Sequence, residues 1–147
     1  MRRAVAIAAI VWLAACGHKA PPVAPELVRP EAPENVAAIV TPDGIRVSWL
    51  RPQKYSGGGR MNDLGGFTIE RATAVGEGQT PVFRKAGTVT LEDQTRFRKE
   101  RRLEWVDKDV TKGTRYVYRV IAITLDGYHS APGGPVAVSY GESPEKP

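Results

Sequence analysis

Residues 115–124, with the sequence RYVYRVIAIT, decide the fold that we expect for this chain. Apolar and aromatic side chains recur at every second position, so four of them share one face of an extended segment: Tyr116, Tyr118, Val120 and Ala122. The other face carries Val117, Arg119, Ile121 and Ile123. A period of two is typical of a strand that is buried on one side. We therefore predict a long central β-strand with the tyrosines pointing into the core.

Shorter runs of the same kind lie on both sides of this segment. We expect strands at residues 35–40 (NVAAIV), 45–49 (IRVSW), 67–71 (FTIER), 103–105 and 135–140, and a weaker pair of edge strands at 82–83 and 87–91. Turn signals separate them, among them TPDG at 41–44 and a flexible glycine-rich loop at 55–66. No amphipathic helix is expected after residue 20. The chain of 147 residues, with 15 glycines and 12 prolines, is therefore predicted to be an all-β sandwich.

Two motifs resemble the fibronectin type III family of immunoglobulin-like domains. Trp49, at the end of IRVSW, is similar to the tryptophan of that family's second strand, and VTKGTRYVYRVIA at 110–122 is similar to its turn-and-strand signature. The resemblance covers roughly residues 32–141 and implies a β-sandwich of about seven strands, with the domain at 34–141. It also implies that the Tyr116 hydroxyl bonds the backbone a few residues upstream. Since this sandwich serves many roles, it does not name a function.

The N-terminus has the pattern of a targeting segment. Two arginines precede twelve apolar residues at 4–15, which as a helix would span about 18 Å, short of the ~30 Å hydrocarbon core of a bilayer. Residues 13–16 (LAAC) resemble the lipobox of bacterial lipoproteins. The resemblance implies that residues 1–15 are a signal peptide and that Cys16 carries the lipid anchor. By the same resemblance, Gly17 after the cysteine implies an outer membrane if the host has two membranes, with the domain facing the periplasm. The alternative is an ordinary buried thiol.

Residues 16–33 are predicted to be a tether between the lipidated cysteine and the domain. The five prolines between positions 21 and 33 remove backbone donors and fix φ, so neither a helix nor a sheet ladder is expected there. An extended polyproline-like spacer of this length would reach roughly 50 Å at ~3.1 Å per residue. A docking role for the segment is the alternative. The polar tail at 142–147 is expected to be disordered.

Several classes of function find no support in the sequence. Cys16 is the only cysteine and the two histidines lie far apart, so no metal site or cofactor is expected. Asp63 has no acidic neighbour in sequence, and the glycine-rich segments lead into a strand instead of a helix, so we expect no enzyme. Without Arg2 and Arg3 the chain has 19 basic and 16 acidic residues. This net charge of +3 is too small to indicate nucleic-acid binding.

Three candidate contact regions remain. The apolar face of Val117, Ile121 and Ile123 could contact a protein, unless long side chains such as Arg71 or Arg119 cover it. The loop with Tyr128 and His129 could touch a ligand. A basic run could contact anionic lipid, although a solvated loop or a protected strand edge is the plainer interpretation: Arg96, Arg98, Lys99, Arg101 and Arg102.

These expectations together describe a lipid-anchored, non-catalytic binding or scaffolding module of the bacterial envelope, attached to the membrane through Cys16. The first alternative is an accessory subunit of a larger envelope complex, in which the Val117 face contacts a protein partner. The second is a surface-exposed adhesion or glycan-binding lipoprotein that uses the loops near Tyr55 and His129.

Overall fold

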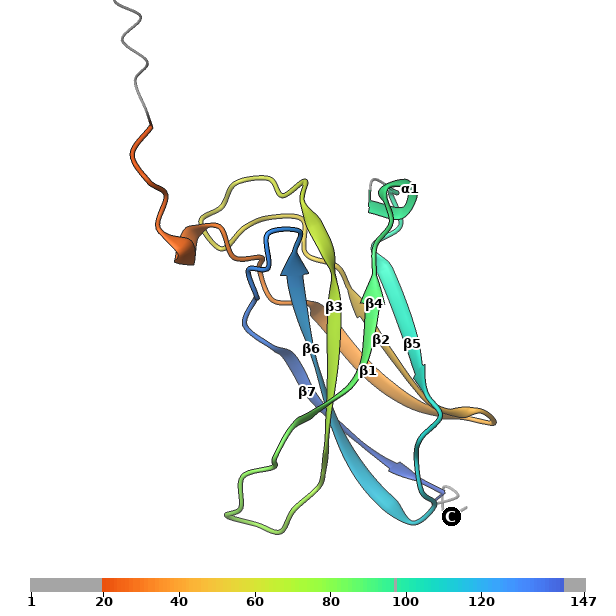
Figure 1. The fold of residues 1–147 in the computed structure, drawn as a ribbon. Helices are drawn as coiled ribbons and strands as arrows, with labels where there is room; N and C mark the ends of the chain where they lie inside the picture. The colour runs from red at the N-terminus through yellow and green to blue at the C-terminus, as the bar shows by residue number, and fades with distance from the viewer. Residues whose placement is uncertain (1–19, 97, 142–147) are drawn as a thin grey trace, which may run out of the picture.

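Seven antiparallel strands form two sheets in the computed structural model, which describes residues 20–96 and 98–141 (Figure 1). The strands are β1 (Glu34–Thr41), β2 (Gly44–Leu50), β3 (Leu64–Thr73), β4 (Arg84–Thr90), β5 (Arg102–Asp107), β6 (Thr114–Thr124) and β7 (Gly133–Tyr140). One sheet has the order β1-β2-β5 and the other β4-β3-β6-β7. A 3₁₀ turn, η1 (Pro25–Leu27), and a one-turn helix, α1 (Asp93–Arg96), complete the described elements. The predicted immunoglobulin-like sandwich is confirmed.

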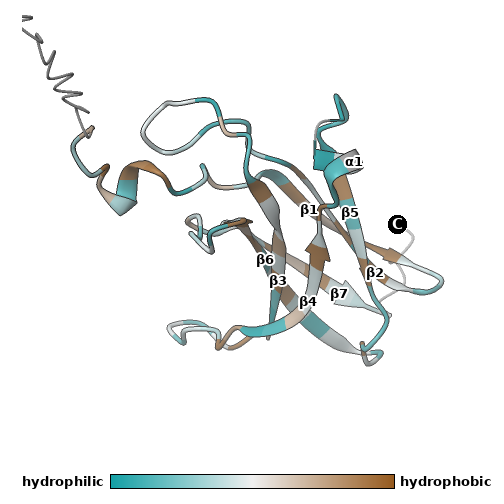
Figure 2. Cartoon of the chain, turned by 45° about the horizontal axis from the view of Figure 1, so that its top comes forward, coloured by the Kyte–Doolittle hydropathy of each residue, from teal (hydrophilic) through white to brown (hydrophobic). Residues whose placement is uncertain are grey.

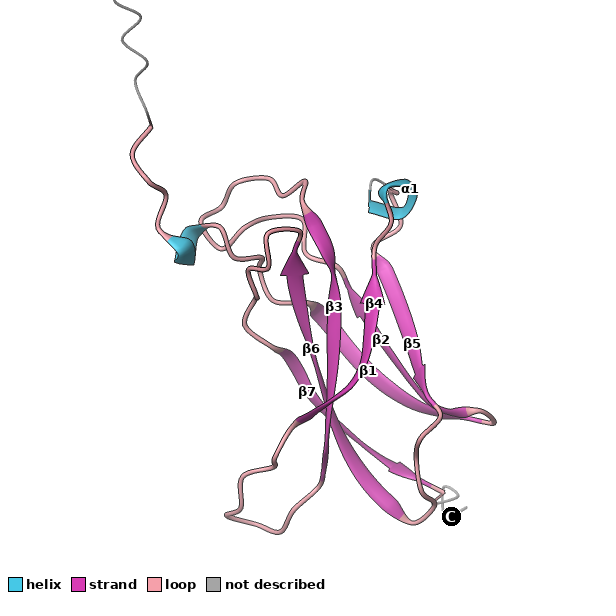
Figure 3. Ribbon diagram, in the orientation of Figure 1, coloured by secondary structure: helices cyan, strands magenta, loops and turns pink. Residues whose placement is uncertain are grey.

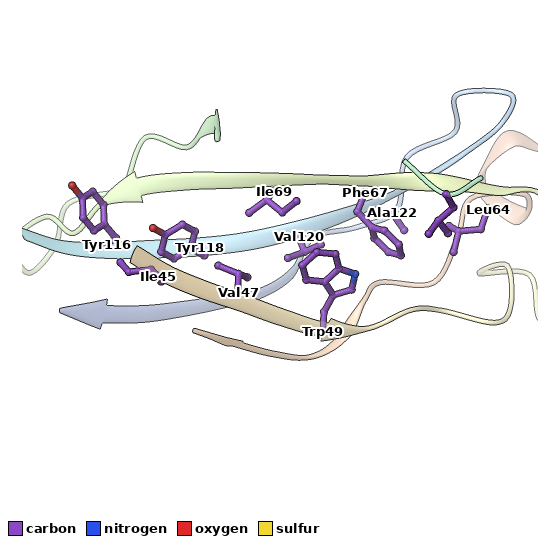
Figure 4. Close-up of a cluster of buried hydrophobic side chains, with 11 residues drawn as sticks. Ile45, Val47, Trp49, Leu64, Phe67, Ile69, Tyr116, Tyr118, Val120 and Ala122 are labelled. Atoms are coloured by element: carbon purple, nitrogen blue, oxygen red, sulfur yellow. The ribbon is translucent and has the colours of Figure 1, made fainter. Parts of the chain in front are cut away.

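The core lies between the two sheets and is centred on β6, as the alternation in residues 115–124 predicts. Tyr118, Val120 and Ala122 are fully buried, and their neighbours on the opposite face are only half-buried. Trp49 on β2 packs against Phe67 on β3 with 5.3 Å between the ring centroids, so the two sheets meet through an aromatic pair (Figure 4). The expected tyrosine contact is also present, because the Thr111 N–H donates to the Tyr116 hydroxyl over 2.9 Å.

Three local expectations differ from the structure. The strand expected at 67–71 begins earlier, at Leu64, because residues 64–66 pair with β6 and β4. Of the two weak edge runs, only 87–91 lies on a strand, β4, which begins at Arg84; residues 82–83 precede it and are not in a strand. The glycine-rich loop is closed by hydrogen bonds from the Tyr55 N–H to the Gly59 carbonyl (2.8 Å) and from the Met61 N–H to the Gln53 carbonyl (2.9 Å).

The second half of the predicted tether packs on the sandwich through a 3₁₀ turn and an isolated bridge, so it is not a free spacer. Pro30 is fully buried and forms an isolated bridge with Tyr55. The Leu27 and Arg29 carbonyls accept backbone hydrogen bonds of 3.2 and 2.8 Å from residues 57 and 56, and the Glu31 N–H donates to the Lys54 carbonyl over 3.0 Å. Proline removes only its own N–H, so carbonyls on either side of it remain free to accept.

Candidate functional site

Three loops and the N-terminal chain gather at one end of the sandwich, which we call the loop end (Figure 3). The loops are residues 51–63 between β2 and β3, 91–101 between β4 and β5, and 125–132 between β6 and β7. Two of them are joined directly, because the Leu125 N–H donates to the Asp63 carbonyl over 2.8 Å. In Figure 2, α1 has the hydrophilic colour and lies at this same end. Loops held on a rigid sandwich in this way are where binding residues usually lie.

A groove of about 720 Å³ opens between the loops 51–63 and 91–101, and we call it the basic groove. Of the eleven described residues that line it, six are cationic and none is acidic. The cations come from both loops: Arg51, Lys54, Arg60, Arg96, Arg98 and Lys99. A concave surface lined by charges of one sign concentrates their electric field, so the groove is suited to an anionic ligand.

Two of these arginines hold the groove together. The Arg51 guanidinium donates through Nη1 to the Thr95 and Arg96 carbonyls, each over 3.0 Å. Arg96 donates through Nε to the Leu64 carbonyl over 3.0 Å and pairs with Asp93 over 2.7 Å. Burial, and then the positive charge of Arg101, lower the pKa of Arg51 from its usual value. These contacts fix loop 91–101 against the sandwich.

The other four cations form the rim of the basic groove. Lys54 lies opposite Arg60 across an antiparallel bridge, and Arg98 and Lys99 follow α1 on the facing loop. All four are exposed, and none of them forms an ion pair with another residue that the structure describes. Their ammonium and guanidinium donors are therefore available to a ligand, unlike those of the two inner arginines.

The basic run predicted from the sequence is thus divided by the fold. Arg101 donates to the Arg51 carbonyl over 3.4 Å and lies 3.7 Å from a Glu34 carboxylate oxygen. Arg102 is on β5 and donates to the Ser48 hydroxyl over 3.3 Å. Arg101 and Arg102, like the inner Arg96, form contacts within the sandwich. Only Arg98 and Lys99 belong to the rim.

Sequence reasoning missed the other half of the rim. Lys54 and Arg60 lie about 40 positions before the basic run: Arg60 is in the loop that we expected to be flexible, and Lys54 directly precedes that loop. Charge density along the chain does not reveal them, because each has few charged neighbours in sequence. The one available signal was the run of three glycines at 57–59 between Lys54 and Arg60, because a tight loop there brings the two cations together.

The predicted apolar face of β6 is interrupted. Val117, Ile121 and Ile123 are half-buried on the outer side of the four-stranded sheet. Arg119 lies between the first two, forms an ion pair with Glu70 and stacks 4.1 Å above the Phe83 ring. Arg119 thus covers part of the face, as the alternative interpretation expected. Arg119 separates Val117 from the pair Ile121 and Ile123, and all three keep part of their apolar surface exposed.

Arg71, the other residue expected to cover that face, lies on the opposite side of its strand. Its guanidinium pairs with the buried Asp107 carboxylate over 2.8 Å, and the same carboxylate accepts from the Tyr118 hydroxyl over 2.8 Å. The Asp109 N–H donates to the second carboxylate oxygen over 3.0 Å. Burial and then Asp107 raise the pKa of Tyr118. This cluster joins β5 to β3 and β6 and so has a structural role.

The remaining predicted residues lie at or beyond the loop end. Tyr128 is 38% exposed and His129 is exposed, and His129 forms an isolated bridge with Ile123. On the neighbouring loop the Tyr55 hydroxyl donates to Asp63 over 2.5 Å; burial and then this carboxylate raise the pKa of Tyr55 to about 12. Cys16, the predicted signal peptide and the tail 142–147 lie outside the described residues.

Two specialised features are absent from the described part of the chain. No helix there is long and apolar enough to cross a bilayer. Among the same residues, no three or more His, Cys, Asp or Glu side chains are grouped so that they could hold a metal ion.

Comparison with known proteins shows the fold of the chain. No protein-family model and no curated protein matches the sequence. Among solved structures, the twitchin kinase region from C. elegans (Fn31-NL-kin-CRD-Ig26) is similar with a TM-score of 0.54 and 20% identity, covering 76% of this chain and 17% of that one. A Fn3-like protein from Clostridium thermocellum has a TM-score of 0.47 and 18% identity, covering 78% of this chain and 96% of that one. The domain is a fibronectin type III-like β-sandwich.

Proposed function

We propose that this protein is a lipid-anchored, non-catalytic binding module of the bacterial envelope, held by acyl chains on Cys16 and facing the periplasm from the outer membrane. The observation that carries the proposal is the path of the N-terminal chain. Residues 27–31 are hydrogen-bonded to loop 51–63, so the chain leaves the sandwich from the loop end (Figure 1). An anchor at Cys16 would therefore direct the basic groove toward the lipid surface.

The docked segment also limits how far the domain can stand from the membrane. If residues 16–24 were extended as polyproline, they would span about 28 Å at ~3.1 Å per residue, compared with roughly 50 Å for the whole predicted tether. Within this reach the loop end can approach the head groups, where the attraction of anionic lipids for basic residues acts over a Debye length of about 8 Å.

The arrangement of the described carboxylates supports a binding role over catalysis. Asp63 accepts a hydrogen bond from Tyr55, and Asp107 is buried with three donors around it. A general acid–base pair needs carboxylates that can reach a substrate and hold different protonation states. Asp63 and Asp107, committed to tyrosine and arginine partners, are instead parts of the scaffold.

A role as an accessory subunit of an envelope complex is the second candidate. It is favoured by Ile121 and Ile123, which leave apolar surface half-exposed on the outer sheet face. This face lies along the side of the sandwich, so a protein could contact it while the loop end faces lipid. The proposal expects a photo-crosslinking residue at Ile121 to capture a discrete protein in intact cells, and the same residue at exposed Asp43, in the turn between β1 and β2 of the other sheet, to capture much less.

The anchor is tested by replacing Cys16 with alanine in the full chain. The unaltered protein should incorporate an acyl label, lose residues 1–15 and fractionate with the outer membrane. Cys16→Ala should remain unacylated and leave that fraction. If the unaltered chain reaches the periplasm without acyl groups, the lipid-anchor proposal is wrong.

A further inference from the structure

We propose that the rim of the basic groove binds the phosphate groups of anionic membrane lipids, with Lys54 and Arg60 on one wall and Arg98 and Lys99 on the other. The inference rests on the proposed function for its orientation toward the membrane. It assigns the contact to residues of two loops, where the sequence pointed to a single basic run.

The chemistry of the rim fits phosphate. Arginine offers a planar set of donors that matches phosphate oxygens, and lysine adds a compact charge on a flexible stem. All four rim side chains are exposed, and the groove lining contributes no carboxylate that would compete with a ligand for them. The walls are held in place by the Arg51 and Arg96 contacts to main-chain carbonyls, so the four cations converge on a preformed surface.

The size of the groove favours a head group over a simple inorganic ion. A volume of about 720 Å³ falls in the range of small-molecule sites, and it is far larger than one phosphate requires. Several phosphates of a lipid surface could therefore contact the rim together. A basic residue near an anionic membrane strengthens binding by roughly fivefold, so four of them acting together could change affinity by a hundredfold or more.

The place of the groove favours a membrane over a free phosphate ester. Tyr55, between the rim residue Lys54 and the loop tip, is bridged to Pro30 of the N-terminal segment. The rim is therefore fixed beside the point from which the chain runs toward Cys16. A domain whose groove served a dissolved ligand would gain nothing from this position.

The test uses the mature chain, residues 16–147, with Cys16→Ser so that acyl chains contribute no binding. Sedimentation with vesicles of phosphatidylglycerol and phosphatidylcholine is compared with vesicles of phosphatidylcholine alone. The groove variant carries Lys54→Gln, Arg60→Gln, Arg98→Gln and Lys99→Gln. The control variant loses the same charge from exposed residues away from the loop end: Arg84→Gln, Lys85→Gln, Lys108→Gln and Lys112→Gln.

We expect binding only to the anionic vesicles, a loss of about a hundredfold in the groove variant and less than about fivefold in the control variant. Equal losses in the two variants would show that net charge alone matters and would overturn the assignment. Absence of binding to the anionic vesicles would also overturn it, as would saturable binding of inorganic phosphate at the rim without vesicle binding. Because acylation is absent from this assay, its result is independent of the Cys16→Ala experiment.

Discussion

Replacement of Asp107 tests whether one buried carboxylate holds the two sheets together. Asp107 is at the end of β5 and is 3% exposed. It accepts hydrogen bonds from Arg71 on β3, from the Tyr118 hydroxyl on β6 and from the Asp109 N–H. Arg71 in turn stacks 5.1 Å from the centre of the Tyr116 ring. Asp107→Ala therefore removes the acceptor shared by three donors from three parts of the chain.

The expected loss of stability follows from what the substitution leaves behind. Breaking a buried ion pair by removing one partner costs about 3–5 kcal/mol, and an orphaned buried hydroxyl alone costs about 1–3 kcal/mol. Because the Arg71 side chain is 25% exposed, water can satisfy part of it. We therefore expect Asp107→Ala to lower the free energy of unfolding by about 3–4 kcal/mol, a large share of the ~5–15 kcal/mol of a typical domain.

Asp107→Asn keeps the shape of the Asp107 side chain but removes its charge. One carboxylate oxygen faces two donors, Arg71 and Tyr118, and the other faces the Asp109 N–H. Whichever way the amide is turned, its NH₂ group therefore meets a donor, and we expect a loss of about 2–3 kcal/mol. Tyr118→Phe should cost about 1–2 kcal/mol alone. Combined with Asp107→Ala it should cost less than the sum, because the orphaned hydroxyl is gone.

Urea unfolding of the mature chain with Cys16→Ser, followed by tryptophan fluorescence, measures these differences. The slope of the free energy against urea should stay constant across the variants, since the exposed surface on unfolding is unchanged. A loss below about 1 kcal/mol for Asp107→Ala, or strict additivity with Tyr118→Phe, would refute the idea that this carboxylate joins the sheets.

Two further predictions concern titration and packing. Burial and a carboxylate partner raise the pKa of Tyr55 from 10.0 to about 12 and also raise that of Tyr118, so the folded state holds these protons more tightly than the unfolded state. The stability that these raised pKa values contribute is complete below pH 10 and is lost as the pH rises toward 12. In a titration followed by tyrosinate absorbance, Tyr55 and Tyr118 should ionise last among the tyrosines. Ionisation of either residue near pH 10 with the fold intact would contradict this prediction. A Cβ on Gly87 would lie 2.4 Å from the Trp105 ring, so Gly87→Ala should destabilise the domain by about 1–3 kcal/mol in urea unfolding. Gly76→Ala, where nothing lies within 4 Å, is the matched control and should be within about 0.5 kcal/mol of the parent.

The central fold could be predicted because its signals are local and periodic. Alternation along residues 115–124 assigned both faces of β6 correctly, and the turn at 41–44 was read from residues whose backbone preferences suit it. The same alternation places Arg71 with Phe67 and Ile69, toward the core. The prediction that Arg71 could cover the outer face was wrong, because it followed the rule that charged residues are exposed and not the two-residue period of the strand.

The candidate site could be predicted only in part, because it depends on contacts between distant segments. A run of basic residues in sequence indicates charge density, but the fold decides which donors are already used. Arg96 and Arg101 each bond main-chain carbonyls, and these bonds depend on where loops 51–63 and 91–101 meet. Reading prolines only as breakers likewise missed the carbonyls of residues 27 and 29, which remain good acceptors.

The docked N-terminal segment would separate the two proposed binding surfaces of the domain. A Cβ on Gly57 would lie 2.8 Å from the Leu27 carbonyl oxygen, so the segment and loop 51–63 are in close contact and define one rigid end. An anchored chain would then place the basic groove at the membrane. The outer face of the four-stranded sheet, with Ile121, would lie along the side of the domain and would not contact the membrane. Lipid binding by the rim and protein binding by the sheet are therefore compatible, because neither needs the surface of the other. The orientation that makes them compatible depends on residues 27–31, whose sequence alone suggested a spacer.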